Sequence, residues 1–132
     1  YVYAHETGYD DDGSPMDGVF VQSGDMDLQD GEQFAFVSRV IPDFKFIGVD
    51  GAGAQTVDLL VRMRDAPGGN LVTDANVAVD SETQVKNIRG RGRQFALKVS
   101  SHNDSSQNTA NRLGVGRRLG STRLDVKPDG RQ

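Results

Sequence analysis

The clearest pattern along the chain is an alternation of apolar and polar residues at positions 56–65. Every second residue of this segment is apolar: Val57, Leu59, Val61 and Met63. The positions between them include three charged residues: Asp58, Arg62 and Arg64. Because successive side chains of a β-strand point to opposite faces, the pattern predicts a strand with one face in the core and the other in water.

Shorter apolar or alternating segments predict further strands, and glycine, proline, aspartate and asparagine separate them. These segments lie at 1–3, 19–21, 33–41, 44–47, 71–72, 77–79 and 95–99, with 71–72 and 77–79 the weakest. Pro42 would end the third of them, because proline cannot donate a hydrogen bond to a neighbouring strand. Three later residues are expected to complete the core: Leu119, Leu124 and Val126.

No window of eleven or more residues repeats its apolar positions with the helical period without containing glycine or proline, so we expect at most one or two turns of helix. The chain is therefore predicted to be all-β. Its 132 residues and 16 glycines fit one domain, residues 1–132, built of many short strands. Strands at intervals of about ten to twenty residues favour an antiparallel β-sandwich with a jelly-roll-like arrangement.

Arginine and glycine alternate at 89–93, and an apolar alternation at 95–99 follows without a break. If this segment is one strand, Arg89, Arg91 and Arg93 share one face, and the glycines leave the other face open to a close backbone approach. A guanidinium suits carboxylate and phosphate equally. The net charge of −4 and the scarcity of nearby aromatics favour carboxylates of the same or a neighbouring subunit, with a solvated face or DNA phosphate as alternatives.

Charge is divided unevenly between the two parts of the chain. Residues 1–85 contain 4 Lys/Arg and 16 Asp/Glu, and residues 86–132 contain 11 and 3, which gives −12 and +8. One interpretation is that strands from both parts interleave, so that the charges mix on the folded surface. The other is an acidic face and a basic face on opposite sides of the subunit, which would meet in a head-to-tail ring.

Composition excludes several classes of protein. The chain has no cysteine, so it has neither disulfides nor thiolate metal sites. No apolar segment approaches the roughly 20 residues that span a bilayer, so membrane insertion is not expected, and the pattern of a signal peptide is absent. Because the sequence opens on Tyr1 and its first residues resemble a strand, we expect it to be an excerpt of a longer polypeptide.

Two acidic clusters are the candidates for a cation site. Residues 10–12 form one, and Asp25, Asp27 and Asp30 form the other, but neither has the spacing of an EF-hand loop. Solvated loops are the preferred interpretation, and no metal or other cofactor is expected. His5 and His102 lack the surroundings of a catalytic triad or a zinc motif, so no catalytic residue is assigned and the chain is not expected to be an enzyme.

Several short segments occur in an order that resembles a known family. They lie at 3–8, 23–31, 40–43, 89–94 and 119–131, and together they resemble the C-terminal region of the stabilisation or hub and nozzle proteins in the short tails of podovirus-type bacteriophages. One departure is visible. The family often has a tryptophan before the Arg-Leu-Gly of its last strand, where this chain has Arg117 and Arg118.

The resemblance implies a structural virion protein that forms a ring, a hexamer by analogy, in the hub or nozzle of a phage tail. Such a protein seals packaged DNA and forms its exit channel without sequence-specific binding, beside the portal, the adaptor and other tail proteins. It is assembled in the host cytoplasm and located in the virion. The family is built around β-propellers, so part of a propeller remains the alternative to the sandwich.

Subunit interfaces in such a ring would use the charged residues of both parts of the chain. The candidates are Arg89, Arg91, Arg93, Arg117, Arg118, Asp25, Asp27 and Asp30. The alternative function is a carbohydrate- or receptor-binding sandwich whose loops at 8–15 and 103–108 touch a cell-surface glycan. A hydrolytic enzyme is the third possibility, although no carboxylate pair stands out.

Overall fold

The computed structural model describes residues 2, 18–27, 32–47, 56–101 and 116–130. These residues form ten β-strands and contain no helix. The strands are β1 (Phe20–Gln22), β2 (Met26–Asp27), β3 (Ala35–Ile41), β4 (Phe44–Ile47), β5 (Val57–Arg64), β6 (Leu71–Val79), β7 (Lys86–Gly92), β8 (Gln94–Ser101), β9 (Gly116–Leu119) and β10 (Arg123–Pro128).

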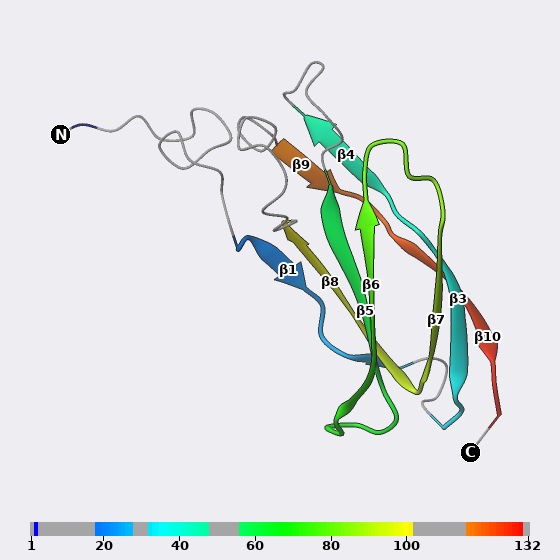
Figure 1. Ribbon diagram of the computed structural model, residues 1–132. Coiled ribbons are helices and arrows are strands. Elements are labelled where there is room, and N and C mark those ends of the chain that lie inside the picture. The colour runs from blue at the N-terminus through cyan, green and yellow to red at the C-terminus, as the bar shows by residue number, and fades with distance from the viewer. Residues whose placement is uncertain (1, 3–17, 28–31, 48–55, 102–115, 131–132) are drawn as a thin grey trace.

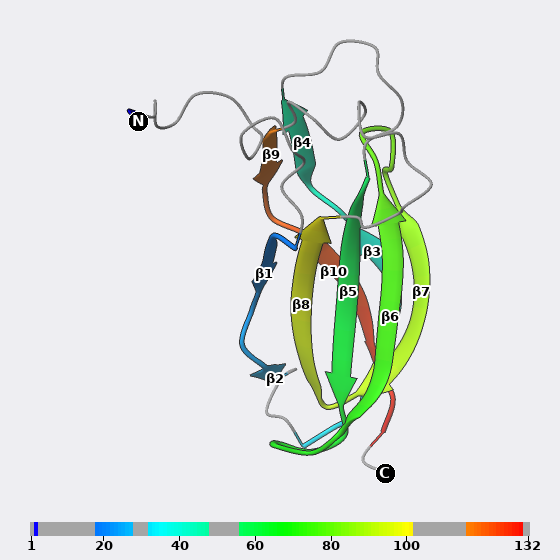
Figure 2. The ribbon, with the colours of Figure 1, turned by 60° about the vertical axis from the view of Figure 1, so that its left-hand side comes forward.

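The strands form two larger antiparallel sheets and a two-stranded ribbon (Figure 1). The first sheet has the order β1-β8-β5-β6, and β2 also pairs with β8. The second sheet has the order β10-β3-β7, and β4 pairs with β9 in the ribbon. Figure 2 shows β3 and β10 behind the first sheet, so the two sheets lie face to face. The all-β prediction is confirmed, and the described strands form a sandwich.

The core lies between the two sheets and depends on the alternation in β5. Val57, Leu59, Val61 and Met63 of this strand are at most 1% exposed, and the residues between them, Leu60 included, are partly exposed. From the second sheet, Val37 and Val40 of β3 and Ile88 of β7 join the same core. Full burial of each such side chain contributes about 1.5–3 kcal/mol, which explains why both sheets turn these residues inward.

The arginine–glycine segment and the apolar alternation after it follow each other without a break in the sequence, but they form two strands in different sheets. β7 ends at Gly92 in the second sheet, and β8 begins at Gln94 in the first. At the crossing, the backbone N–H of Arg93 donates to the carbonyl oxygen of Arg64, 2.8 Å away. A Cβ at Gly92 would lie 3.0 Å from that oxygen and from Met63 Cβ, so the glycine permits the close approach to β5.

Two weaker expectations are also corrected. Segments 71–72 and 77–79 belong to one strand, β6, because it pairs with β5 along its whole length and the polar residues between them take part in the ladder. Leu119 does not complete the core. It is 45% exposed on β9, while Leu124 and Val126 of β10 are partly buried against the core as expected.

The β3–β10 pair continues into the β4–β9 ribbon after a short interruption. β3 ends at Ile41, before Pro42, as predicted. The backbone N–H groups of Gly120 and Ser121 donate to Asp43, the first to its carbonyl oxygen at 2.7 Å and the second to Oδ2 at 3.0 Å. A Cβ at Gly120 would overlap that carboxylate, so a side chain there would displace it from the Ser121 N–H.

Some expectations fall on residues that the structure does not describe. The strand predicted at 1–3 and the loops at 8–15 and 103–108 lie largely or wholly outside the described residues. Within the described ranges, no helix has the length and apolar character needed to cross a membrane.

Candidate functional site

The arginines of β7 lie on the outer face of the second sheet. Arg89 and Arg91 are exposed, and the intervening Gly90 and Gly92 are buried, which confirms the predicted alternation. Arg93 follows the strand and is half-buried at the crossing to β8. Gly92 faces β5 so closely that an added Cβ would lie 3.0 Å from the Arg64 carbonyl oxygen, which explains why this inward position has no side chain.

Two of these arginines are held within the subunit by Phe34. Their guanidinium carbons lie over its ring, 4.1 Å from the centroid for Arg91 and 4.5 Å for Arg93. Arg91 also bonds Asp129, with Nε 2.5 Å from Oδ2 and Nη2 3.2 Å from the carbonyl oxygen. Phe34 is 8% exposed, so its ring is a fixed platform for both cations.

The same face carries a second ion pair and two cations that have no ion-pair partner among the described residues. Arg39 on β3 donates to Oδ2 of Asp125 on β10 through Nε at 3.0 Å and Nη2 at 2.7 Å. Arg89 and Lys127 are exposed and have no ion-pair partner among the described residues. We call Arg39, Arg89, Arg91 and Lys127 the outer basic face.

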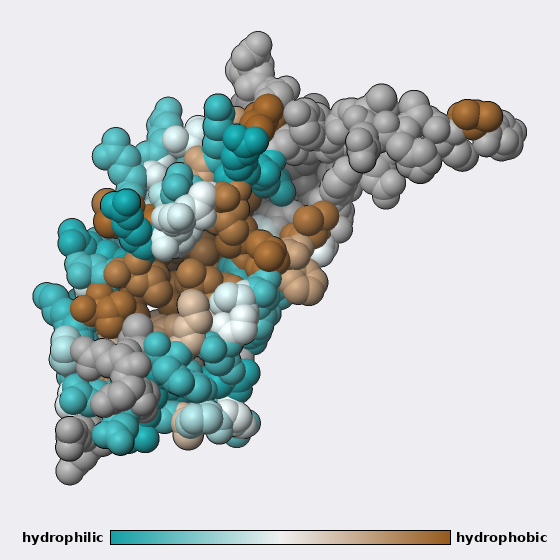
Figure 3. Space-filling view, turned by 180° about the vertical axis from the view of Figure 1, so that it is seen from behind, coloured by the Kyte–Doolittle hydropathy of each residue, from teal (hydrophilic) through white to brown (hydrophobic). Residues whose placement is uncertain are grey.

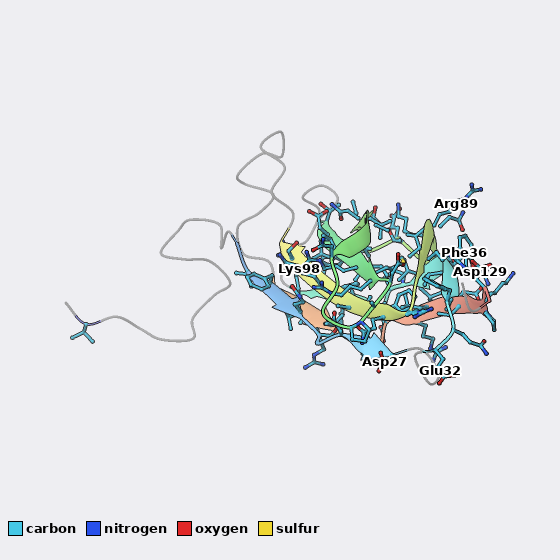
Figure 4. The ribbon with its side chains drawn as sticks, turned by 90° about the horizontal axis from the view of Figure 1, so that it is seen from below. Asp27, Glu32, Phe36, Arg89, Lys98 and Asp129 are labelled. Atoms are coloured by element: carbon cyan, nitrogen blue, oxygen red, sulfur yellow. The ribbon has the colours of Figure 1, made fainter. Side chains whose placement is uncertain are left out.

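The outer basic face surrounds an open depression of about 780 Å³. Its lining includes Phe36, Ser38, Arg39, Asn87, Arg89 and Lys127. Figure 4 shows Arg89 extending away from the sandwich, with Phe36 and Asp129 on the same side of the molecule. The arrangement offers cationic and neutral hydrogen-bond donors around a partly exposed aromatic ring, which suits an acidic or polar partner.

The predicted acidic residues lie at one end of the sandwich. Asp25 and Asp27 are in and beside β2, a strand that sequence patterns did not predict. Asp25 Oδ2 is 3.3 Å from Arg64 Nε, and Asp27 Oδ1 accepts a hydrogen bond from Gln94 Nε2 at 2.7 Å. Asp30 lies outside the described residues. Two residues are too few for a strand pattern to be visible, and only pairing with β8 defines β2.

Arg117 and Arg118 lie on opposite faces of the β4–β9 ribbon. Arg117 is opposite Phe46 and lines an apolar pocket of about 180 Å³ with Phe44 and Leu119. Arg118 is opposite Lys45 on the other face. Lys45 is not among the predicted interface residues, although it stands between two phenylalanines in a strand pattern that predicts an outward side chain.

Apolar side chains gather across the back of the molecule (Figure 3). Phe20 and Val21 of β1 are 60% and 55% exposed beside the apolar pocket. β1 is an edge strand whose one side pairs with β8. This region is therefore a second candidate surface.

Strands from the acidic and basic parts of the chain interleave in both sheets. β8 lies between β1 and β5, and β3 lies between β10 and β7. The interleaving of strands agrees with the interpretation of mixed charges, and the Arg39–Asp125 ion pair joins the two parts of the chain, whereas Arg64–Asp25 and Arg91–Asp129 each lie within one part. An excess of positive charge nevertheless remains on the outer basic face, where four cations accompany Asp125 and Asp129.

Hydrogen bonds within the turn between β6 and β7 lower the pKa of Asp80. The Thr83 hydroxyl donates to Asp80 Oδ1 at 2.7 Å, and this hydrogen bond is the main cause that lowers the pKa of Asp80 below 3.8. The Glu82 backbone N–H, 3.0 Å from the same oxygen, acts in the same direction. These bonds organise the turn between β6 and β7, which explains the shift structurally.

No group of three or more His, Cys, Asp or Glu side chains that could hold a metal occurs within the described ranges. His5, His102 and the acidic residues at 10–12 lie outside those ranges. The fold and surface thus define an antiparallel β-sandwich with a basic outer sheet. The chain matches no protein-family model, no curated protein and no solved structure.

Proposed function

We propose that this chain is a non-catalytic structural module that assembles with copies of itself into a ring, in the hub or nozzle of a short phage tail. The resemblance of its short segments to the podovirus-type stabilisation proteins supports the location in a tail. In that role, six copies beside the portal and adaptor would seal packaged DNA and form its exit channel without reading its sequence. Assembly would take place in the host cytoplasm.

One observation carries the assembly: Arg89 and Lys127 are exposed cations without an ion-pair partner among the described residues, on a rigid sheet. Their neighbours Arg39 and Arg91 already bind Asp125 and Asp129. The remaining positive charge fits carboxylates of a neighbouring copy, because the whole chain has four more acidic than basic residues.

Charge reversal of the two cations tests the proposal. We expect Arg89→Glu with Lys127→Glu to weaken self-association at 0.1 M salt, measured by multi-angle light scattering, and to remove rings from negative-stain images. Gln84→Glu adds a negative charge at an exposed residue of the β6–β7 turn and is the control that should still assemble. Raising the salt to 1 M shortens the screening length from about 10 Å to about 3 Å and should also dissociate the wild type.

A wild-type chain that stays monomeric at low salt would overturn the proposal. So would unchanged assembly of the doubly reversed variant. Arg91 and Arg93 are kept in this experiment, because both pack on Phe34 and their loss would also disturb the fold.

A second candidate function is glycan binding at the depression. Phe36, Ser38 and Asn87 line it and provide an aromatic ring with neutral hydrogen-bonding groups, the combination that sugar rings require. Glycan-array binding that is lost in Phe36→Ala, with the fold intact by circular dichroism, would favour this function over assembly.

A further inference from the structure

The β4–β9 ribbon places two cations directly opposite each other. Lys45 and Arg118 are register partners, and both are exposed. Opposite residues of antiparallel strands have Cβ atoms about 4.5–5.5 Å apart, so like charges there repel each other. Neither residue has an ion-pair partner in the described part of the chain. A bound carboxylate would replace this repulsion with two attractive contacts.

The opposite end of the sandwich carries suitable carboxylates. Asp27 on β2 receives a hydrogen bond from Gln94 and has no cationic partner within the described ranges. Asp65, directly after β5, is exposed and likewise has none there. The register places the two at the same end, because Gln94 is opposite both Asp27 and Arg64.

The ribbon and these carboxylates are too far apart to meet within one chain. β2 pairs with the first residues of β8, whereas the ribbon shares the apolar pocket with Val99 and Ser100 near the end of β8. Figures 1 and 2 both show β4 and β9 at one end of the sandwich and the turn from β7 to β8 at the other. Any pairing of the two surfaces therefore joins different copies.

We propose that the Lys45–Arg118 pair of one copy binds Asp27 and Asp65 of the next. This contact rests on the proposed self-assembly and adds a second pair of surfaces to the outer basic face. Because two different surfaces meet, the contact is head-to-tail, and it closes into a ring when the rotation between successive copies divides a full turn. The argument for a second copy as the partner is the charge complementarity of the two ends.

Lys45→Glu is the decisive variant, because it has opposite effects on folding and on assembly. Within one chain it places a carboxylate opposite Arg118 and should stabilise the ribbon. Between chains it sets a negative charge against Asp27 and Asp65, so we expect the association constant to fall about tenfold or more, measured by mass photometry during dilution. A loss of assembly with a higher unfolding midpoint cannot be due to misfolding.

Asp65→Lys should weaken association by a similar factor, and the double variant Lys45→Glu, Asp65→Lys should restore it. Glu82→Lys makes the same change in an exposed residue of the β6–β7 turn and is the matched control that should assemble like the wild type.

The outcomes separate the two proposals. A wild type that does not associate overturns both. Association that survives Lys45→Glu overturns the head-to-tail contact and leaves assembly through the outer basic face intact. Sensitivity to Lys45→Glu without sensitivity to Asp65→Lys, or without rescue by the double variant, shows that the ribbon takes another anion and also overturns the contact.

Discussion

Two neighbouring strand pairs differ in the residue that lies opposite a cation. In the β3–β10 pair, Arg39 is opposite Asp125, and their Nη2 and Oδ2 atoms are 2.7 Å apart. In the β4–β9 ribbon, which continues that pair, Lys45 is opposite Arg118. We call the two larger sheets the body of the sandwich. In the body, Asp125 neutralises Arg39 within the chain, whereas in the ribbon two like charges, Lys45 and Arg118, lie opposite each other. Whether a cation can bind another molecule therefore depends on the residue opposite it on the neighbouring strand.

We expect the largest effect from truncating one core side chain between the two larger sheets. Leu59→Ala should lower the free energy of unfolding by about 2–5 kcal/mol, because it leaves a cavity in a fully buried site between the sheets. Urea unfolding followed by circular dichroism measures this loss. Leu60→Ala is the control: its side chain points to the other face and is half-buried, so the loss should be about 1 kcal/mol. Equal losses would contradict the assigned core face.

The next largest effect is expected at the junction between the β3–β10 pair and the β4–β9 ribbon. Gly120→Ala places a Cβ where the Asp43 carboxylate lies, so that carboxylate must move and give up the hydrogen bond from the Ser121 N–H. We expect a loss of about 1–2 kcal/mol in the free energy of unfolding. Gly24→Ala, where no atom lies within 4 Å of the added Cβ, should change it by about 0.5 kcal/mol or less. A neutral Gly120→Ala would show that the junction tolerates a side chain.

The β6–β7 turn tests how far a carboxylate of the body is stabilised by its own chain. Thr83→Val removes the hydroxyl that lowers the pKa of Asp80 and should cost about 1 kcal/mol at pH 7. Because the folded pKa lies below the unfolded one, this carboxylate stabilises the fold above pH 3.8, and the contribution is lost as the pH falls through the folded value.

The difference between wild type and Thr83→Val in thermal or urea unfolding should therefore be larger at pH 7 than at pH 2.5. Ser81→Ala, an exposed change in the same turn, should show no such pH dependence. A difference that grows on acidification would contradict the lowered pKa of Asp80.

The smallest expected effects are changes in stability on charge reversal, and their signs distinguish the β4–β9 ribbon from the β3–β10 pair. Lys45→Glu should raise the free energy of unfolding of the monomer by a few tenths of a kcal/mol, whereas Arg39→Glu should lower it by a similar amount. Both changes should shrink in 1 M salt, because all four residues are at least partly exposed. Unfolding at protein concentrations below the association range measures them. Changes of the same sign would remove the distinction between body and ribbon.

Much of the strand arrangement was readable from local patterns. The core face of β5 and the outward arginines of β7 follow from the two-residue period, and Pro42 follows β3 because it lacks a donor. The crossing at Arg93 was not readable, because the alternation continues while the pairing partner changes. β2 and the exposure of Leu119 were missed for the same reason: both depend on which strand lies beside them.

The candidate surfaces were predicted less completely than the fold. Arg89 was found by its spacing, but sequence alone did not show that Phe34 and Asp129 hold Arg91 or that Lys127 lies on the same face. Lys45 was not recognised, because its importance comes from Arg118, a residue far away in the sequence.

The amino-acid sequence by itself determined where most strands lie and which of their residues face inward, because the alternation of side chains is a property of the local backbone. Only the tertiary structure decided which strands are neighbours, where the chain changes sheet and which charges meet. Strand register joins residues distant in the sequence, and it depends on the hydrogen bonds and packing of the whole sandwich. This is why Arg39 has a carboxylate opposite it, while Lys45 has another cation.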